Sequence, residues 1–438
     1  MATPDPYLPG HGDTRYRVRH YDLRLDYKVT TNRLDEVARL ELVITEATER
    51  IELDLSGLQV SKLSVDGRKA RFRQRNRKVV VDLPGAQPGD EHSLRITCGG
   101  KPRPVPGIHG AAGWEELTDG VLVGSQPNGA PSWFPCNDDA ANKASYRIQL
   151  DVAASYHVVA NGTLTEHSQH GGQTRWVYEM DQPMAPYLAT VQIGRYVADR
   201  RASVVPVELV HPANLGVGAG TAFEFQAEMV SHFSELFGPY PFAEYRAVVA
   251  DDVLEIPLEA QGLSSFGRNF AQPTWDNERL VAHELSHQWF GNSVTAQQLC
   301  DIWLHEGFAC YAEWLWSDHC AASGRTPTVQ EQARRHHEQL ARKKQDLVLS
   351  APGMPDMFDD RVYKRGALTL HAVRCVLGER AFFQMLRSWA TENAGAVVTS
   401  RQFVTHCMQF TSDDGFDVAA TLDTWLNQPR LPALPVLR

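Results

Sequence analysis

The sequence predicts an α+β fold in which an N-terminal all-β domain is followed by a mainly helical domain. Short alternating or apolar runs fill the first part of the chain, and turn residues such as Asp66-Gly67 and Pro84-Gly85 separate them. Stretches with helical periodicity follow from about residue 222. With 438 residues and 43% apolar content, the chain can build more than one core. We place the boundary near residue 200, between domains 1–200 and 201–438.

The first domain is expected to consist of short strands joined by turns. One stretch, 99–113, is rich in proline and glycine and predicts a long loop. A basic cluster precedes the third strand, and we interpret it as an exposed hairpin with alternating charges rather than an anion site. The cluster consists of Arg68, Lys69, Arg71, Arg73, Arg75, Arg77 and Lys78. The predicted strands are 40–44, 51–55, 79–81, 146–152, 175–180 and 187–197.

The second domain is expected to begin with a helix over 222–237, after a Gly-rich loop at 211–220. A helix over 277–290 follows, for which Thr274 or Asp276 can act as N-cap and Gly291 as the stop. A further helix is predicted over 302–316. The remaining predicted helices are 328–346, 363–377, 379–391, 400–410 and 418–427.

The helix over 277–290 carries the strongest chemical signal, the sequence His283-Glu284-Leu285-Ser286-His287. At 3.6 residues per turn, His283 and His287 lie one above the other on one helix face, where both can bind one metal ion. Glu306 follows after eighteen residues on the next predicted helix and can supply a third ligand. An amphipathic helix whose two histidines only share one face is the simpler alternative.

Three protein ligands leave one position of a tetrahedral zinc ion open, as catalytic rather than structural zinc sites do. Such an ion lowers the pKa of its water to about 7. Glu284, next to His283, can accept the proton of that water. The pattern therefore predicts a zinc hydrolase with one ion held by His283, His287 and Glu306.

The wider motif resembles the aminopeptidase N family of zinc peptidases, which includes leukotriene hydrolase. The resemblance rests on 283–292 and on Asp301-Ile302-Trp303-Leu304-His305-Glu306-Gly307-Phe308-Ala309. Phe237-Gly238-Pro239-Tyr240-Pro241-Phe242 and Val362-Tyr363-Lys364-Arg365-Gly366-Ala367 match further family segments in the right order. The resemblance implies a saddle-like N-terminal β domain and a thermolysin-like catalytic domain that contains a small β-sheet.

The resemblance also implies the residues that bind the substrate. Ile256-Pro257-Leu258-Glu259-Ala260-Gln261-Gly262-Leu263 aligns with the family segment whose glutamate binds the α-ammonium group of a peptide, which makes Glu259 that residue rather than Glu255. An internal peptide nitrogen carries no charge to pair with a carboxylate, so this group selects free N-termini. Gln126 lies where the family places a pocket glutamine. Pro257 departs from the pattern because it has no N–H to donate to the substrate.

Tyr363 falls in the segment that resembles the family's catalytic-tyrosine motif. When water attacks the scissile carbonyl, a negative oxygen develops, and a phenol aimed at it stabilises the transition state more than the ground state. We therefore predict Glu284 and Tyr363 as the catalytic residues. An ordinary packing role of the tyrosine ring is the alternative.

Composition restricts the partners and the location. The formal charge of −10 is spread along the chain and disfavours nucleic acid. No apolar run is long enough for a secretory signal or a membrane span, so we expect a cytoplasmic enzyme without membrane contact. Seven cysteines at irregular spacing indicate no disulfide or metal framework. We expect a monomer.

The chain stops where longer members of the resembled family continue into a further β domain and a large helical domain that roofs the active site. We therefore expect a short form with a more open cleft. The predicted function is an aminopeptidase that acts on peptides with a free N-terminus. A zinc endopeptidase with an open cleft, a leukotriene-type epoxide hydrolase and a catalytically inactive binding protein are the alternatives.

Overall fold

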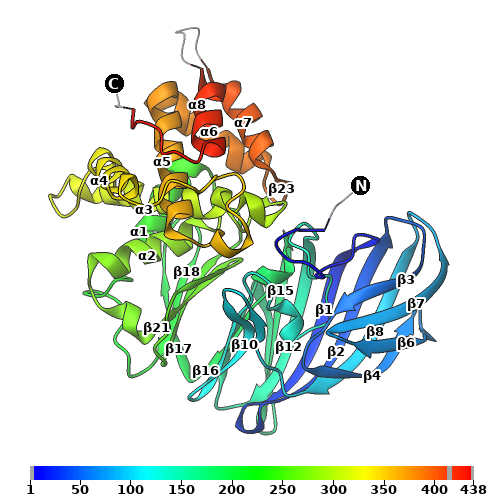
Figure 1. Cartoon of the computed structure of the whole chain (residues 1–438). Helices are drawn as coiled ribbons and strands as arrows, with labels where there is room; N and C mark the ends of the chain where they lie inside the picture. Colours follow the sequence, from blue (N-terminus) through cyan, green and yellow to red (C-terminus); the bar gives the residue numbers. More distant parts are fainter. Residues whose placement is uncertain (1–3, 412–416, 436–438) are drawn as a thin grey trace. The chain divides into compact units, whose positions relative to one another are not determined.

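The computed structural model describes residues 4–411 and 417–435, which form two compact units (Figure 1). The first unit contains the chain up to Arg200 together with Glu208–Gly216 and Phe242–Asn269. The second unit contains Arg201–Val207, Val217–Pro241 and the chain from Phe270 onward. Between residues 201 and 269, successive segments of the chain belong alternately to the two units. The single domain boundary near residue 200 stays a prediction.

The largest element of the first unit is an eight-stranded sheet with the order β14-β15-β12-β1-β2-β8-β4-β5. Its strands alternate between buried and exposed residues, as in β1, where Tyr21, Leu23 and Leu25 are buried. This period of two lets one face of the sheet pack on a core while the other stays polar. The strands are β1 Tyr16–Lys28, β2 Arg33–Ile44, β4 Leu58–Val65, β5 Arg68–Lys69, β8 Glu91–Gly100, β12 Ala144–Ala153, β14 Thr163–His170 and β15 Gln173–Met184.

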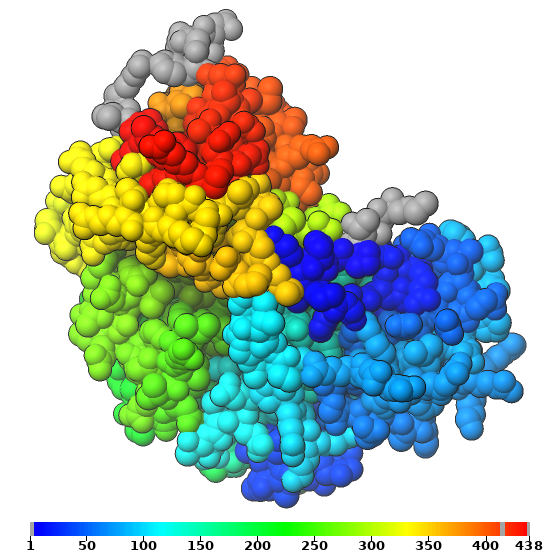
Figure 2. All heavy atoms as spheres, viewed as in Figure 1, coloured from blue at the N-terminus to red at the C-terminus, as the bar shows by residue number. Residues whose placement is uncertain are grey.

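Two smaller sheets accompany it, a three-stranded sheet β3-β7-β6 and a five-stranded sheet β13-β16-β11-β10-β9. Arg73 and Arg75 lie exposed on β6, which forms a hairpin with β7, in agreement with the predicted hairpin. The segment before β1 lies on the surface of this unit (Figure 2, dark blue), where Asp54 accepts a hydrogen bond from Gly12 N. The strands are β3 Thr48–Asp54, β6 Phe72–Arg75, β7 Lys78–Ala86, β9 Val105–Gly107, β10 Gly110–Leu117, β11 Gly120–Gly124, β13 His157–Ala160 and β16 Val191–Gly194.

The prediction of a long loop over 99–113 is wrong, because β9 and the start of β10 lie inside it. The glycines and prolines of this stretch indicated turns, but β9 pairs with β10 from Gly107↔Gly110 to Val105↔Ala112, and β10 then pairs with β11. β10 also carries the fully buried Trp114. Sheet pairing and burial of an indole ring therefore override the local preference for a loop.

A fourth sheet, β17-β18-β19-β21-β20, begins close to the predicted boundary, at Tyr196. β19 is buried along its whole length, and β20, on the edge of the sheet, carries Glu259. The parallel pairing of β19 with β21 fits a buried strand without polar alternation. The strands are β17 Tyr196–Arg201, β18 Val207–Pro212, β19 Tyr245–Ala250, β20 Leu258–Ala260 and β21 Leu263–Gly267.

The second unit is mainly helical, with one small sheet formed by β22 Thr295–Ala296 and β23 Val397–Val398. In the described ranges, no helix is both long and apolar enough to cross a membrane. The helices are α1 Gln226–Phe237, α2 Trp275–Ser286, α3 Trp303–Ala321, α4 Val329–Ala341, α5 Asp360–Leu377, α6 Glu379–Glu392, α7 Ser400–Met408 and α8 Val418–Asn427.

The cap of the helix with the two histidines is confirmed, but its end differs from the prediction. The side chain of Thr274 accepts a hydrogen bond from the backbone N–H of Asn277. α2 ends at Ser286, and the chain continues in turns in which Asn292 N donates to His287 O. Hydrogen bonds that span five residues instead of four replace the regular helical pattern here, so α2 ends four residues before the predicted end at Phe290.

The large sheet contains a buried carboxyl group that predicts a pH dependence of stability. Glu36 on β2 is 2% exposed, and its Oε2 accepts a hydrogen bond from Cys98 Sγ at 3.1 Å. Burial raises the pKa of Glu36 to about 8. The folded state therefore binds one proton more than the unfolded state between the ordinary Glu pKa and about 8, and stability falls as pH rises through this range.

We expect Glu36→Gln to raise the melting temperature at pH 8.5 and to change it little at pH 5, because an amide carries no charge to desolvate. The gain in unfolding free energy at pH 8.5 is on the order of a few kcal/mol. Thermal unfolding from pH 5 to 9 measures both effects. Glu41→Gln, on the same strand and bonded to Ser93, is the matched control. An equal change of the two variants at every pH would contradict the prediction.

Candidate metal and catalytic site

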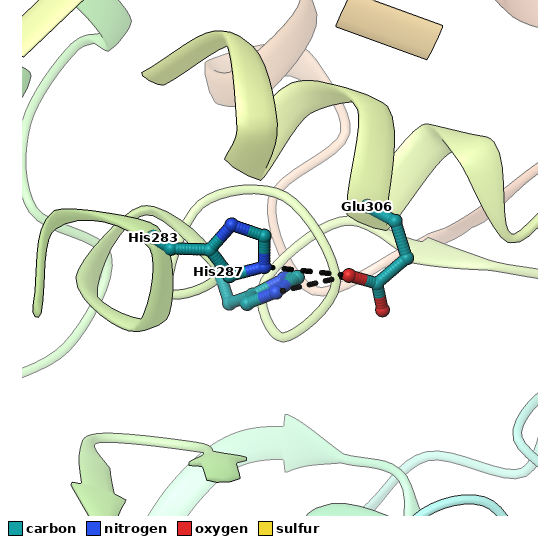
Figure 3. A group of neighbouring side chains, drawn as sticks. All are labelled: His283, His287 and Glu306. Atoms are coloured by element: carbon teal, nitrogen blue, oxygen red, sulfur yellow. Dashed lines mark ion pairs between the residues drawn. The ribbon is translucent and has the colours of Figure 1, made fainter. Parts of the chain in front are cut away.

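Three side chains of the second unit converge on one point. His283 lies in the last turn of α2, His287 follows one turn later as the C-cap residue of this helix, and α3 presents Glu306 (Figure 3). Glu306 Oε2 lies 3.5 Å from His283 Nε2 and 3.6 Å from His287 Nε2. All three residues are buried. The predicted ligand set is thus brought together by two helices.

The donor set fits zinc. Ligand atoms 2.0–2.1 Å from a tetrahedral zinc ion lie about 3.3–3.5 Å from one another, close to the separations found here. His283 Nδ1 lies 2.7 Å from Glu313 Oε1, and His287 Nδ1 lies 3.1 Å from Phe290 O. A neutral imidazole that donates through Nδ1 presents the lone pair of Nε2, the atom that faces Glu306 in both rings.

The two predicted catalytic residues lie beside this group in the same unit. Glu284, between the histidines in sequence, is 4% exposed, and its carboxylate lies within 4.8 Å of a ring nitrogen of His287. Tyr363 lies in the first turn of α5, and its ring stacks on that of His283 with centroids 6.0 Å apart at 18°. The three candidate metal ligands, a carboxylate and a phenol therefore lie close together.

A contact between two glycines sets how closely α3 and α5 approach. An added Cβ on Gly366 would lie 2.6 Å from Gly307 Cα, and one on Gly307 would lie 2.7 Å from Gly366 Cα. Both contacted atoms belong to the backbone, so no side-chain rotation can relieve the clash. Because Gly307 follows Glu306 and Gly366 follows Tyr363 by three residues, this contact helps to fix the relative position of these two side chains.

We expect Gly366→Ala to push α5 away from α3, with a loss of about 1–3 kcal/mol of stability and a lower kcat from the displaced Tyr363. Chemical denaturation and steady-state kinetics measure the two effects. Gly216→Ala, where an added Cβ would meet nothing within 4 Å, is the control. Wild-type stability of Gly366→Ala would show that the helices can separate without cost.

Sequence reasoning missed three charged residues near the candidate ligand His283. They are Glu313, Arg279 and Lys364. Glu313 Oε2 accepts a hydrogen bond from Arg279 Nη1 at 3.0 Å, while its Oε1 faces His283. A signal was available, because Glu313 follows Glu306 by seven residues, two helical turns, and so lies on the same face of α3.

Neighbouring charged residues shift the pKa values of His283 and Glu313. Burial lowers the pKa of His283, but hydrogen bonds to Glu306 and Glu313 outweigh burial and raise the pKa to about 10. Burial alone would raise the pKa of Glu313, but the charge of Lys364, the bond to His283 and the charge of Arg279 hold it well below its usual range. The two carboxylates thus favour a cation at His283.

The two residues predicted to bind substrate lie together in the first unit. Gln126 follows β11, and its Nε2 donates a hydrogen bond to Glu259 Oε1 at 2.6 Å. Glu259 is half-buried on β20, where it pairs in register with Ser264 of β21. Pro257 comes directly before this strand. The amide of Gln126 therefore fixes the orientation of the Glu259 carboxylate.

Comparison with known proteins places the chain in a family. The model of the peptidase family M1 domain matches residues 221–425, and the model of the peptidase M1 N-terminal domain matches 18–188. The chain belongs to peptidase family M1. The predicted family and fold class are thereby confirmed, since the β domain and the helical domain follow each other in this order.

Relatives of the M1 family share the fold over the whole chain. An M1 zinc metallopeptidase from Deinococcus radiodurans, solved as a variant bound to the substrate Tyr-Ser-Ala, has a TM-score of 0.90 and 30% identity, with 100% of both chains covered. Leucyl aminopeptidase from Saccharolobus solfataricus is 25% identical over 96% of this chain. Glutamyl aminopeptidase from Sus scrofa is 23% identical over 95% of this chain.

This M1 chain is shorter than the aminopeptidases to which it is similar. It spans 54% of the Saccharolobus solfataricus protein and 46% of the Sus scrofa protein, about half the length of the curated relatives. The Deinococcus radiodurans structure, in contrast, is matched from end to end.

Proposed function

We propose that this M1 chain is a zinc-dependent aminopeptidase that hydrolyses the first peptide bond of peptides with a free N-terminus. The observation that carries the proposal is the convergence of His283, His287 and Glu306 beside Glu284 and Tyr363. The similarity to a metallopeptidase solved with a tripeptide substrate supports it.

His283, His287 and Glu306 would hold the ion. When bound, zinc supplies Lewis acidity, which polarises the scissile carbonyl and makes the attacking water more acidic. Glu284 accepts the proton of that water and passes it to the leaving amine. The hydroxyl of Tyr363 donates a hydrogen bond to the carbonyl oxygen as it becomes negative.

Glu259 and Gln126 are the proposed groups for the N-terminus of the substrate. The Glu259 carboxylate pairs with the α-ammonium group, and the hydrogen bond from Gln126 holds this carboxylate in one orientation. The pairing separates an aminopeptidase from an endopeptidase, because only a chain end carries this charge.

The test is a pair of chromogenic substrates, a leucine conjugate with a free amine and the same conjugate with an acetylated amine. We expect zinc-dependent release from the free amine, no release from the acetylated form, and loss of activity with a chelator. Glu259→Gln is expected to raise KM for the free amine at least tenfold, because an amide cannot pair with the ammonium charge.

An endopeptidase is the second candidate, since Pro257 cannot donate the backbone hydrogen bond of a typical M1 substrate segment. Cleavage of an acetylated internal peptide by the zinc-loaded protein would favour it and would contradict the aminopeptidase. Absence of any cleavage with zinc bound would favour a binding protein. Monomeric state and cytoplasmic location stay predictions.

A further inference from the structure

Glu313 is a buried charged residue that lies outside the proposed ligand and catalytic set but contacts one of the proposed ligands. Glu313 is 4% exposed and lies on α3, two turns after Glu306. One oxygen contacts His283 Nδ1 at 2.7 Å, and the other contacts Arg279 Nη1 at 3.0 Å. Both contacts reach α2, the helix that carries His283 and is capped by His287.

Lys364 of α5 supplies a positive charge near the same carboxylate. It follows Tyr363 in sequence, and its Nζ contacts Cys310 Sγ on α3 at 3.3 Å. The charges of Lys364 and Glu313 attract each other in the buried region behind the metal group. α2 and α3 therefore meet at this carboxylate, and α5 adds a nearby positive charge.

The bond to His283 has a direct consequence for metal binding. A carboxylate that accepts a hydrogen bond from Nδ1 fixes both the tautomer and the plane of the imidazole, so that Nε2 stays turned toward the ion. It also makes Nε2 a better electron-pair donor. Arg279 and Lys364 balance the buried charge of Glu313, which would otherwise be costly to desolvate.

We propose that Glu313 is a positioning residue that orients His283 and sets the zinc affinity of the site, with Arg279 and Lys364 as its counter-charges. The inference rests on the proposed zinc site, but it makes a separate claim, because Glu313 has no place among the ligands. Loss of such a second carboxylate weakens metal binding by about 10–100-fold.

The experiment measures the dissociation constant for zinc by competition with a chromophoric chelator, and the melting temperature of each metal-free protein. We expect Glu313→Gln to raise the dissociation constant 10–100-fold, since a neutral amide is a weaker acceptor. Glu313→Asp keeps the charge but shortens the side chain by one methylene, and we expect an intermediate increase.

Glu278→Gln is the matched control. Glu278 is also a buried glutamate of this unit, and it binds Arg325 Nη2 at 2.8 Å and Trp316 Nε1 at 2.9 Å without contact to a proposed ligand. We expect wild-type zinc affinity for this variant even if its melting temperature falls. The comparison separates an effect on the ligand from a general loss of stability.

Each outcome decides a separate point. Wild-type zinc affinity of Glu313→Gln, or an equal loss in Glu278→Gln, would overturn the proposed role of Glu313. If Glu313→Gln does not fold without metal, an unchanged dissociation constant of Glu313→Asp overturns it. A wild-type protein that binds no zinc contradicts the proposed function instead, so the two failures are distinguishable.

Discussion

Replacing Glu284 with glutamine is expected to lower kcat by three to four orders of magnitude, about the upper range for a general base. The amide has nearly the shape of the carboxylate but cannot accept a proton from water. The three ligands are left intact, so the zinc content should stay at one ion per chain. Steady-state kinetics with a free-amine leucine conjugate and metal analysis of the same sample measure both quantities.

The control for this variant is Glu278→Gln, which removes a buried carboxylate from the same helix, α2. Its kcat should stay within a few-fold of wild type. Substantial activity of Glu284→Gln with zinc bound would mean that another group accepts the proton. Loss of zinc together with activity would show that Glu284 has a structural role at the metal instead.

Removing the hydroxyl of Tyr363 is expected to give the second largest effect. Tyr363→Phe should lower kcat by about 100- to 1000-fold, the range found when one donor to a developing oxyanion is removed. KM should change little, because the hydrogen bond strengthens only as the negative charge forms. The ring stacking on His283 is kept, so zinc affinity should not change.

Tyr311→Phe is the matched control for the tyrosine variant. Tyr311 is a buried tyrosine of the same unit, and Arg374 Nη1 donates a hydrogen bond to its hydroxyl oxygen at 3.2 Å. Its removal should affect stability more than kcat. A rise in KM with unchanged kcat for Tyr363→Phe would assign the phenol to substrate binding rather than to the transition state.

Much of the site could be predicted from the sequence because its signals are local. The spacing of His283 and His287 is a property of one helix turn, and Thr274 caps that helix as predicted. The alternation of residues in β2, β3 and β7 predicted strands for the same reason, a period of two along one segment.

What could not be predicted depends on residues that are distant in the sequence. β9 pairs with β10 in a Pro- and Gly-rich stretch, and Trp114 on β10 is buried against Tyr27 of β1, with ring centroids 4.8 Å apart. Local propensity does not contain this contact.

The sequence by itself determined the family, the order of a β domain and a helical domain, and the residue types of a zinc hydrolase. These follow from spacing within single elements and from motifs that are contiguous in the chain. Only the tertiary structure decided that Glu313 contacts His283 and that Gln126 donates to Glu259. The physical reason is that a hydrogen bond requires atoms about 3 Å apart, and only packing brings residues of different elements to that distance.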